Sequence, residues 1–161
     1  MSALSMRIIH AEKHRKEEDP MRYFIVASHG PLSTAILESA SLIAGKETFR
    51  NFRAIYVTMQ DSPENIRQTV DNCMVDFPEE AEIIALTDVF GGSVTNILTE
   101  YIQSRNLHIV TGMNLGMVID AGFSGVETST EELIEALIHT GQRGIRCVNS
   151  EIDNNELEDE I

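Results

Sequence analysis

The chain has 161 residues, of which 42% are hydrophobic, and this is enough for one globular domain with a real core. Its formal net charge of −14 argues against binding nucleic acid or an anionic membrane, and we expect neither a secretory signal nor a membrane span, because no apolar run is long enough for either. The two cysteines, Cys73 and Cys147, have neither disulfide-framework nor zinc-site spacing. We therefore expect a cytoplasmic protein with two buried free thiols and no metal.

The chain divides into three parts. Residues 1–20 mix charges of both signs and end at Pro20, so we expect a leader that is disordered or forms a short helix. Residues 21–149 carry the apolar patterns of a domain. Residues 150–161 are strongly acidic and are expected to be a solvated tail.

Short apolar runs inside the domain predict strands, and most of these runs do not alternate with polar residues. Such runs are typical of strands that are buried on both faces of a parallel sheet. Strands are predicted at residues 22–28, 52–57, 83–86, 107–111 and 145–148. Helical stripes lie between the strands, so we expect a doubly wound, mainly parallel α/β fold.

The helices are predicted from their apolar stripes and their ends, at residues 31–44, 62–78, 94–102 and 129–140. Gly45 and Gly141 are placed as C-terminal caps, and Ser129 with Glu132 forms a capping box. Residues 112–117 are expected to be a turn at the carboxyl end of the fourth strand.

Two strand ends carry polar side chains that can meet. His29 follows the first strand within Ser28-His29-Gly30, and Asp88 follows the third. In an open parallel sheet of order 2-1-3-4, the ligand crevice lies outside the carboxyl ends of strands one and three. A neutral imidazole and a carboxylate are therefore expected to converge there.

The turn Gly91-Gly92-Ser93 connects the third strand to the next helix, where backbone N–H groups can point at an anion. Together, histidine, carboxylate and turn suit a phosphoryl group carried on histidine, since a hydrogen bond from Nδ1 to Asp88 would leave Nε2 free to attack. Asn114 is the next polar residue that could reach this site, or it simply forms a turn.

Each feature also has a purely structural interpretation. His29 could be a strand-end histidine in a hydrogen-bonded turn, Asp88 a helix cap, and the glycines an ordinary connection. The occurrence of all three at matching strand ends favours phosphoryl transfer. His108 lies within a strand, and we expect it to be a packed or edge residue.

The segments Ser28–Gly30, Asp88–Ser93 and Gly112–Asn114, in this order of elements, resemble the EIIA components of the mannose/sorbose/fructose branch of the bacterial phosphoenolpyruvate-dependent sugar phosphotransferase system. The resemblance covers about residues 21–148. It implies that His29 accepts phosphoryl from the phosphocarrier HPr and passes it to a histidine of the cognate EIIB, without a cofactor, while EIIC and EIID are indirect partners. Asp88 would orient the ring, and the candidate phosphoryl ligands are Ser28, Gly91, Gly92 and Ser93, with Asn114 at the rim.

The resemblance also implies a homodimer in which residues 144–148 cross to the partner subunit as an antiparallel fifth strand. Val94 and Gly116 stand where the family usually has proline, and Phe90 stands where mannose transporters often have tryptophan. These departures leave the transporter subclass and the sugar open.

Two other functions stay open on the sequence. One is a regulatory module in which phosphorylation of His29 reports sugar supply to a partner. The other is the phosphotransfer subunit of a dihydroxyacetone kinase, whose turn is usually Gly-Ser instead of Gly-Gly-Ser.

Overall fold

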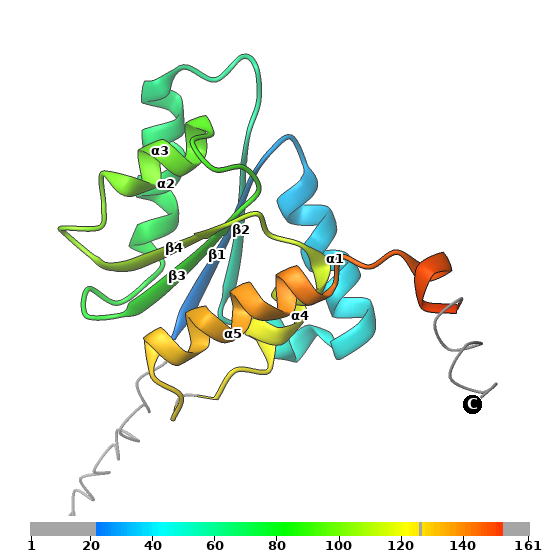
Figure 1. Ribbon diagram of the computed structural model, residues 1–161. Helices are drawn as coiled ribbons and strands as arrows, with labels where there is room; N and C mark the ends of the chain where they lie inside the picture. Colours follow the sequence, from blue (N-terminus) through cyan, green and yellow to red (C-terminus); the bar gives the residue numbers. More distant parts are fainter. Residues whose placement is uncertain (1–21, 126, 153–161) are drawn as a thin grey trace, which may run out of the picture.

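A computed structural model describes residues 22–125 and 127–152. Its centre is a parallel sheet whose strand order is β2-β1-β3-β4, as predicted (Figure 1). The strands are β1 (Tyr23–His29), β2 (Phe52–Val57), β3 (Glu82–Thr87) and β4 (Asn106–Thr111). Since β1 and β3 are direct neighbours, the residues that follow them emerge side by side at the carboxyl edge.

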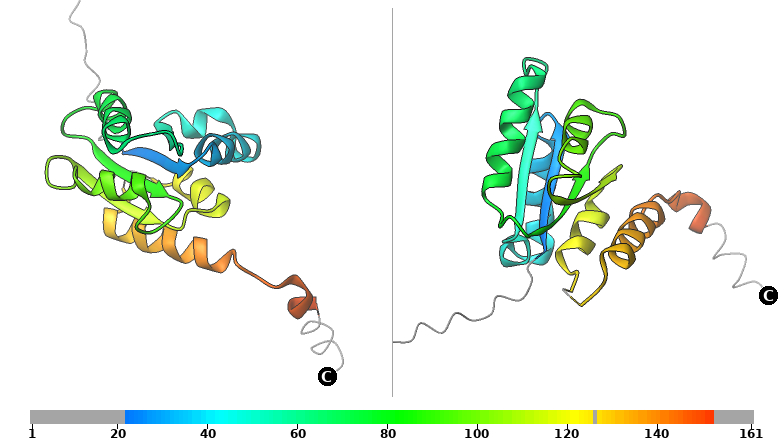
Figure 2. Two further views of the ribbon diagram at one scale, coloured as in Figure 1. Left: turned by 90° about the horizontal axis from the view of Figure 1, so that it is seen from above. Right: turned by 90° about the vertical axis from the view of Figure 1, so that its left-hand side faces the viewer.

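Helices cover both faces of the sheet, which makes three layers (Figures 1 and 2). One face carries α2 (Pro63–Val75) and α3 (Ser93–Thr99). The other carries α1 (Leu32–Ala44), α4 (Leu115–Gly122) and α5 (Thr130–Arg143), with a 3-10 turn, η1 (Lys46–Phe49), between α1 and β2.

The central strands are apolar at nearly every position because each face packs on its own helical layer. In β1, Ile25 faces α2 and α3, while Val26 faces α1, α4 and α5. In β3, Ile83 and Ile84 divide in the same way, and both are fully buried. The apolar runs therefore lack alternating polar residues because both faces of these strands are buried, as expected.

Helix α4 was not predicted, because its eight residues begin within the segment expected to be a turn. Gly141 was also misjudged as the end of the last helix, which continues to Arg143. A Cβ at Gly141 would lie 2.7 Å from Cε of Met117 in α4. This glycine therefore allows two helices to approach each other instead of terminating one.

The predicted fifth strand is not formed in the single chain. Residues 145–147 are irregular, residues 148–152 form a helical turn, and the segment leads away from the sheet (Figures 1 and 2). A strand needs the backbone of another strand to pair with, and this segment pairs with none of the described strands. Strand exchange and the homodimer stay predictions.

Other expectations have mixed outcomes. Cys73 is buried as expected, whereas Cys147 is exposed because it lies in the segment that leaves the domain. The leader and all but the first residues of the acidic tail lie outside the described residues. In the part of the chain that the structure describes, no helix has the length and apolar character needed to cross a membrane.

Candidate active site

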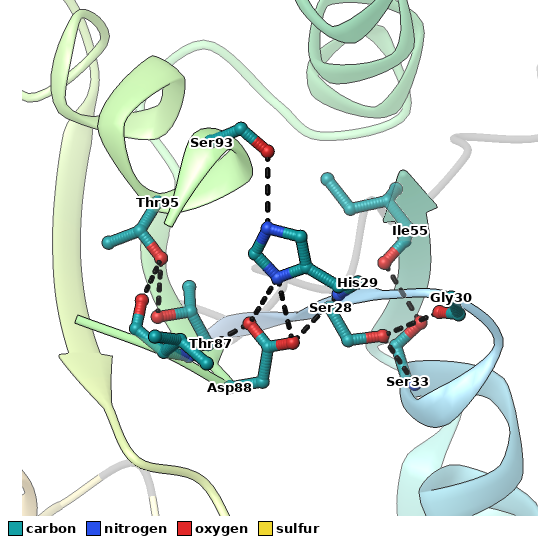
Figure 3. A network of polar contacts seen from close by, with 10 residues as sticks. Ser28, His29, Gly30, Ser33, Ile55, Thr87, Asp88, Ser93 and Thr95 are labelled. Atoms are coloured by element: carbon teal, nitrogen blue, oxygen red, sulfur yellow. Dashed lines mark hydrogen bonds and ion pairs between the residues drawn. The ribbon is translucent and has the colours of Figure 1, made fainter. Parts of the chain in front are cut away.

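His29 and Asp88 meet at the carboxyl edge, as the strand order predicts (Figure 3). Nδ1 of His29 lies 3.0 Å from Oδ2 and 3.3 Å from Oδ1 of Asp88. The backbone N–H of His29 also donates to Oδ2, at 2.7 Å, and the N–H of Val89 donates to Oδ1, at 2.8 Å. The carboxylate is therefore fixed by main-chain donors and in turn orients the imidazole ring.

The hydrogen bonds also set the charge of Asp88. Its side chain is only 10% exposed, and this burial acts to raise its pKa. The bonds from the backbone and ring of His29 and from the N–H of Val89 outweigh burial, so the pKa of Asp88 lies below its ordinary value of 3.8. An ionised carboxylate only accepts, so Nδ1 carries the proton and Nε2 of a neutral ring has a free lone pair.

Ser93 and Gly92 surround the other side of the ring. The hydroxyl of Ser93 lies 3.2 Å from Nε2 of His29, and it can donate to that nitrogen. A Cβ built on Gly92 would lie 2.6 Å from Cε1 of His29. Only glycine allows this approach, and His29 remains accessible because its side chain is 46% exposed.

The turn from Val89 to Gly92 brings these groups to the ring. The N–H of Gly92 donates to the carbonyl of Val89 at 3.1 Å, and Gly91 has a φ of +73°, which favours glycine at this position of the turn. The N–H groups of Ser93 and Val94 donate to no acceptor within the described residues. The first turn of α3 therefore leaves these two amides without a protein acceptor in the part of the chain that the structure describes.

Ser28 does not face the crevice with His29, because successive side chains of a strand point to opposite faces. It is fully buried, and its hydroxyl accepts from the N–H of Ser33 at 2.7 Å and donates to the carbonyl of Gly30 at 2.9 Å. The structure therefore gives Ser28 a role in shaping the turn and corrects its placement among the phosphoryl ligands.

Asn114 is likewise used within the fold. Its Oδ1 accepts from the N–H of Met117 at 3.1 Å, which caps α4, and its Nδ2 donates to the carbonyl of Gly141 at 2.9 Å. Asn114 thus caps α4 and joins it to α5, a structural role different from the simple turn that the sequence offered as the alternative, and its place at the rim of the site stays a prediction. His108 is half-buried on the edge strand β4, where such a residue was expected.

The sequence did not single out two buried threonines behind this site, Thr87 and Thr95. The only signal was their position, directly before Asp88 and in the first turn of the following helix.

In residues 22–125 and 127–152, no group of three or more His, Cys, Asp or Glu side chains could hold a metal ion.

The low pKa of Asp88 leads to a pH-dependent stability prediction. The ionised form is stabilised by folding, so its contribution is full above the ordinary carboxyl range and is lost as the pH falls through the native-state pKa. We expect Asp88→Asn to lower the free energy of unfolding by about 1–2 kcal/mol at neutral pH and to differ little from wild type in acid. Urea unfolding over a pH series measures this, and a difference that does not change with pH would contradict it.

The fold and the site define a class: a doubly wound α/β protein with a carboxylate-oriented histidine at the point where the strand order reverses. The family described as PTS system fructose IIA component matches residues 23–138. The chain belongs to this EIIA family, so it is a component of a sugar phosphotransferase system.

Individual relatives agree with this assignment. The chain is 22% identical over 130 residues to the PTS system fructose-specific EIIA component of Bacillus subtilis (strain 168), and the match covers 80% of this chain and 88% of that protein. The mannose/sorbose-specific IIA subunit from Enterococcus faecalis superposes with a TM-score of 0.72 at 24% identity, covering 78% of this chain and 93% of the other. For the EIIA component from Streptococcus agalactiae, the TM-score is 0.71 at 25% identity, and the shares are 81% and 99%.

Proposed function

We propose that this protein is a phosphoryl carrier that accepts phosphoryl from phospho-HPr on Nε2 of His29 and passes it to a histidine of the cognate EIIB. The supporting observation is the orientation of one imidazole. Its Nδ1 is held by the ionised Asp88, while its Nε2 lies beside the hydroxyl of Ser93 on an accessible ring. EIIB in turn would serve the membrane subunits EIIC and EIID.

In the first step, the lone pair of Nε2 attacks the phosphorus of the donor phosphohistidine. A P–N bond forms on His29 as the P–N bond of the donor breaks, and the electron pair of that bond returns to the donor imidazole. His29 keeps its proton on Nδ1, so its ring gains positive charge, which the carboxylate of Asp88 stabilises. The second step repeats this exchange with the EIIB histidine, and similar P–N bonds are made and broken.

The transition state is loose, with charge spread over three phosphoryl oxygens, so it needs positioned donors more than covalent help. Candidate donors are the hydroxyl of Ser93 and the amides of Ser93 and Val94, which have no other acceptor within the described residues. Gly91 and Gly92 would contribute by shaping the turn that presents them.

Transfer between two histidines requires each partner to dock around His29. The turns at this edge expose apolar side chains: Phe90 is 88% exposed, and Met59 and Val89 are also exposed. Aromatic residues, phenylalanine among them, are enriched in the buried centres of protein interfaces. We expect Phe90→Ala to raise the KM for phospho-HPr about tenfold with little change in kcat, because it removes docking area without touching the imidazole.

The matched control for Phe90→Ala is Val75→Ala. Val75 is a similarly exposed apolar residue at the end of α2, so its truncation should leave both constants unchanged. Steady-state kinetics with varied phospho-HPr separate the two constants. A Phe90→Ala protein with the wild-type KM would exclude this docking role.

The proposed function is tested by a two-step relay with purified proteins. HPr is phosphorylated from labelled phosphoenolpyruvate, the label is passed to this protein, and the isolated phosphoprotein is mixed with the cognate EIIB. We expect label on this protein that is acid-labile and base-stable, followed by its appearance on EIIB. Labelling without onward transfer to EIIB would contradict the carrier role and would favour the regulatory alternative.

A further inference from the structure

At both strand ends of the site, a buried residue with a side-chain hydroxyl directly precedes the site residue, and that hydroxyl bonds to the first turn of the following helix. Ser28 precedes His29, and its hydroxyl accepts from the N–H of Ser33 in the first turn of α1. Thr87 precedes Asp88, and its hydroxyl lies 3.0 Å from that of Thr95 in the first turn of α3 (Figure 3).

The directions of the threonine hydrogen bonds follow from counting donors. Oγ1 of Thr95 lies 3.0 Å from both the hydroxyl of Thr87 and the carbonyl of Val89. A hydroxyl has one proton, and a carbonyl can only accept. Both contacts are satisfied only if Thr87 donates to Thr95 and Thr95 donates to Val89. Because Thr87 is fully buried and Thr95 nearly so, these hydroxyls are cut off from bulk solvent and depend on each other and on Val89 for their hydrogen bonds.

This chain of hydrogen bonds ends on the carbonyl that closes the turn of the site. The carbonyl of Val89 also accepts from the N–H of Gly92. Gly92 lies against Cε1 of His29, and the next residue, Ser93, places its hydroxyl at Nε2. A shift of the Val89 carbonyl would therefore move both groups relative to the imidazole.

We propose that Thr95 is a positioning residue for phosphoryl transfer. Its hydroxyl accepts a hydrogen bond from Thr87 and donates one to the carbonyl of Val89. These bonds hold the Val89–Gly92 turn so that the hydroxyl of Ser93 stays within hydrogen-bonding distance of Nε2 of His29. This inference rests on the proposed function. It assigns Thr95 no contact with the phosphoryl group, and its effect passes through the main chain of the turn.

The opposite side of the ring has a parallel arrangement. The hydroxyl of Ser33 is fully buried and donates to the carbonyl of Ile55 in β2 at 2.8 Å, which ties the first turn of α1 to the sheet. The turn that carries His29 is therefore fixed independently of Thr95. Loss of the Thr95 hydroxyl should displace the Ser93 side of the site and leave the His29 side in place.

The test compares three variants of the full chain in transfer from phospho-HPr. Thr95→Val keeps the shape but removes the hydroxyl, whereas Thr95→Ser keeps the hydroxyl. Thr99→Val is the matched control, because Thr99 lies on the same helix, is exposed, and donates only to the carbonyl of Asn96 in its own helix. Circular dichroism and thermal unfolding establish that each variant is folded at the assay temperature.

We expect Thr95→Val to lower kcat about tenfold with an unchanged KM for phospho-HPr, because misplaced donors weaken the transition state but leave the docking surface intact. Thr95→Ser and Thr99→Val should stay within about twofold of wild type. A purely structural role would lower the unfolding temperature of Thr95→Val without lowering kcat of the folded protein, and this result would overturn the proposal. An equal loss of kcat in Thr99→Val would also overturn it.

If Thr95→Val does not fold, Thr87→Val provides the test, since it removes only the donor to Thr95. We expect its kcat to fall about threefold, and an unchanged kcat would overturn the proposal. The outcome is separable from that of the proposed function. If wild type fails to accept phosphoryl from phospho-HPr, the function itself is wrong, whereas a normal wild-type relay with an unaffected Thr95→Val refutes only the positioning role.

Discussion

Replacing His29 with alanine should abolish acid-labile, base-stable labelling by phospho-HPr, with a loss of at least about 10³-fold, because it removes the nitrogen that forms the P–N bond. The oxygens of Asp88 already accept from the N–H groups of His29 and Val89, and an acyl phosphate on this carboxylate would be base-labile, unlike phosphohistidine. The hydroxyl of Ser93 has no hydrogen-bonded base other than the imidazole that would be removed. The measurement is the initial rate of label transfer from phospho-HPr to the purified variant.

His108→Ala is the control for the loss of an imidazole in general. His108 lies on the edge strand β4, and its ring nitrogen Nε2 bonds to the side chain of Asn106. This variant should be labelled at the wild-type rate. Equal labelling of the two alanine variants would refute the assignment of His29.

Gly92→Ala should lower the rate of transfer about hundredfold, although the substitution adds a single methyl group. The new Cβ would lie 2.6 Å from Cε1 and 3.4 Å from Nε2 of His29 and 3.2 Å from the carbonyl of Val89. Contact at the first of these distances is not sterically possible, so the ring or the turn has to move. Either movement separates Nε2 from the donors around Ser93.

Gly116→Ala provides the comparison for Gly92→Ala. Gly116 is an exposed residue in the first turn of α4, and an added Cβ would meet only ordinary contacts, at 3.5 Å from Oδ1 of Asn114 and 3.9 Å from a methyl group of Thr140. We expect normal transfer and a gain of about 0.4–1 kcal/mol in stability, as for alanine at a compatible helical glycine. Full activity of Gly92→Ala would show that the close approach to His29 is not needed.

The sheet was predictable because its sequence signal is strong and local. Continuous apolar runs such as Ile83–Leu86 have few alternatives to a buried parallel strand, and the rule for the switch point then brings His29 and Asp88 together. The strand predicted at residues 145–148 is not formed in the single chain, since its apolar residues show only that the segment can pair, not what it pairs with.

The roles that the sequence misjudged depend on tertiary packing. Nothing in the sequence distinguishes Gly141 as a helix cap from Gly141 as a contact for Met117. The same is true of Asn114, whose amide bonds to a carbonyl 27 residues away. Alternation along β1 could have excluded Ser28 from the crevice, because a residue adjacent to His29 in a strand points to the other face.

The orientation of the His29 ring is tested most directly by identifying which of its two nitrogens is phosphorylated. ¹⁵N and ³¹P NMR of the protein labelled by phospho-HPr, with ¹⁵N in the histidine rings, identifies which nitrogen is bonded to phosphorus. We predict a phosphoryl group on Nε2 of His29 and a proton retained on Nδ1, facing Asp88. A phosphoryl group on Nδ1, or on any residue other than His29, would contradict this prediction.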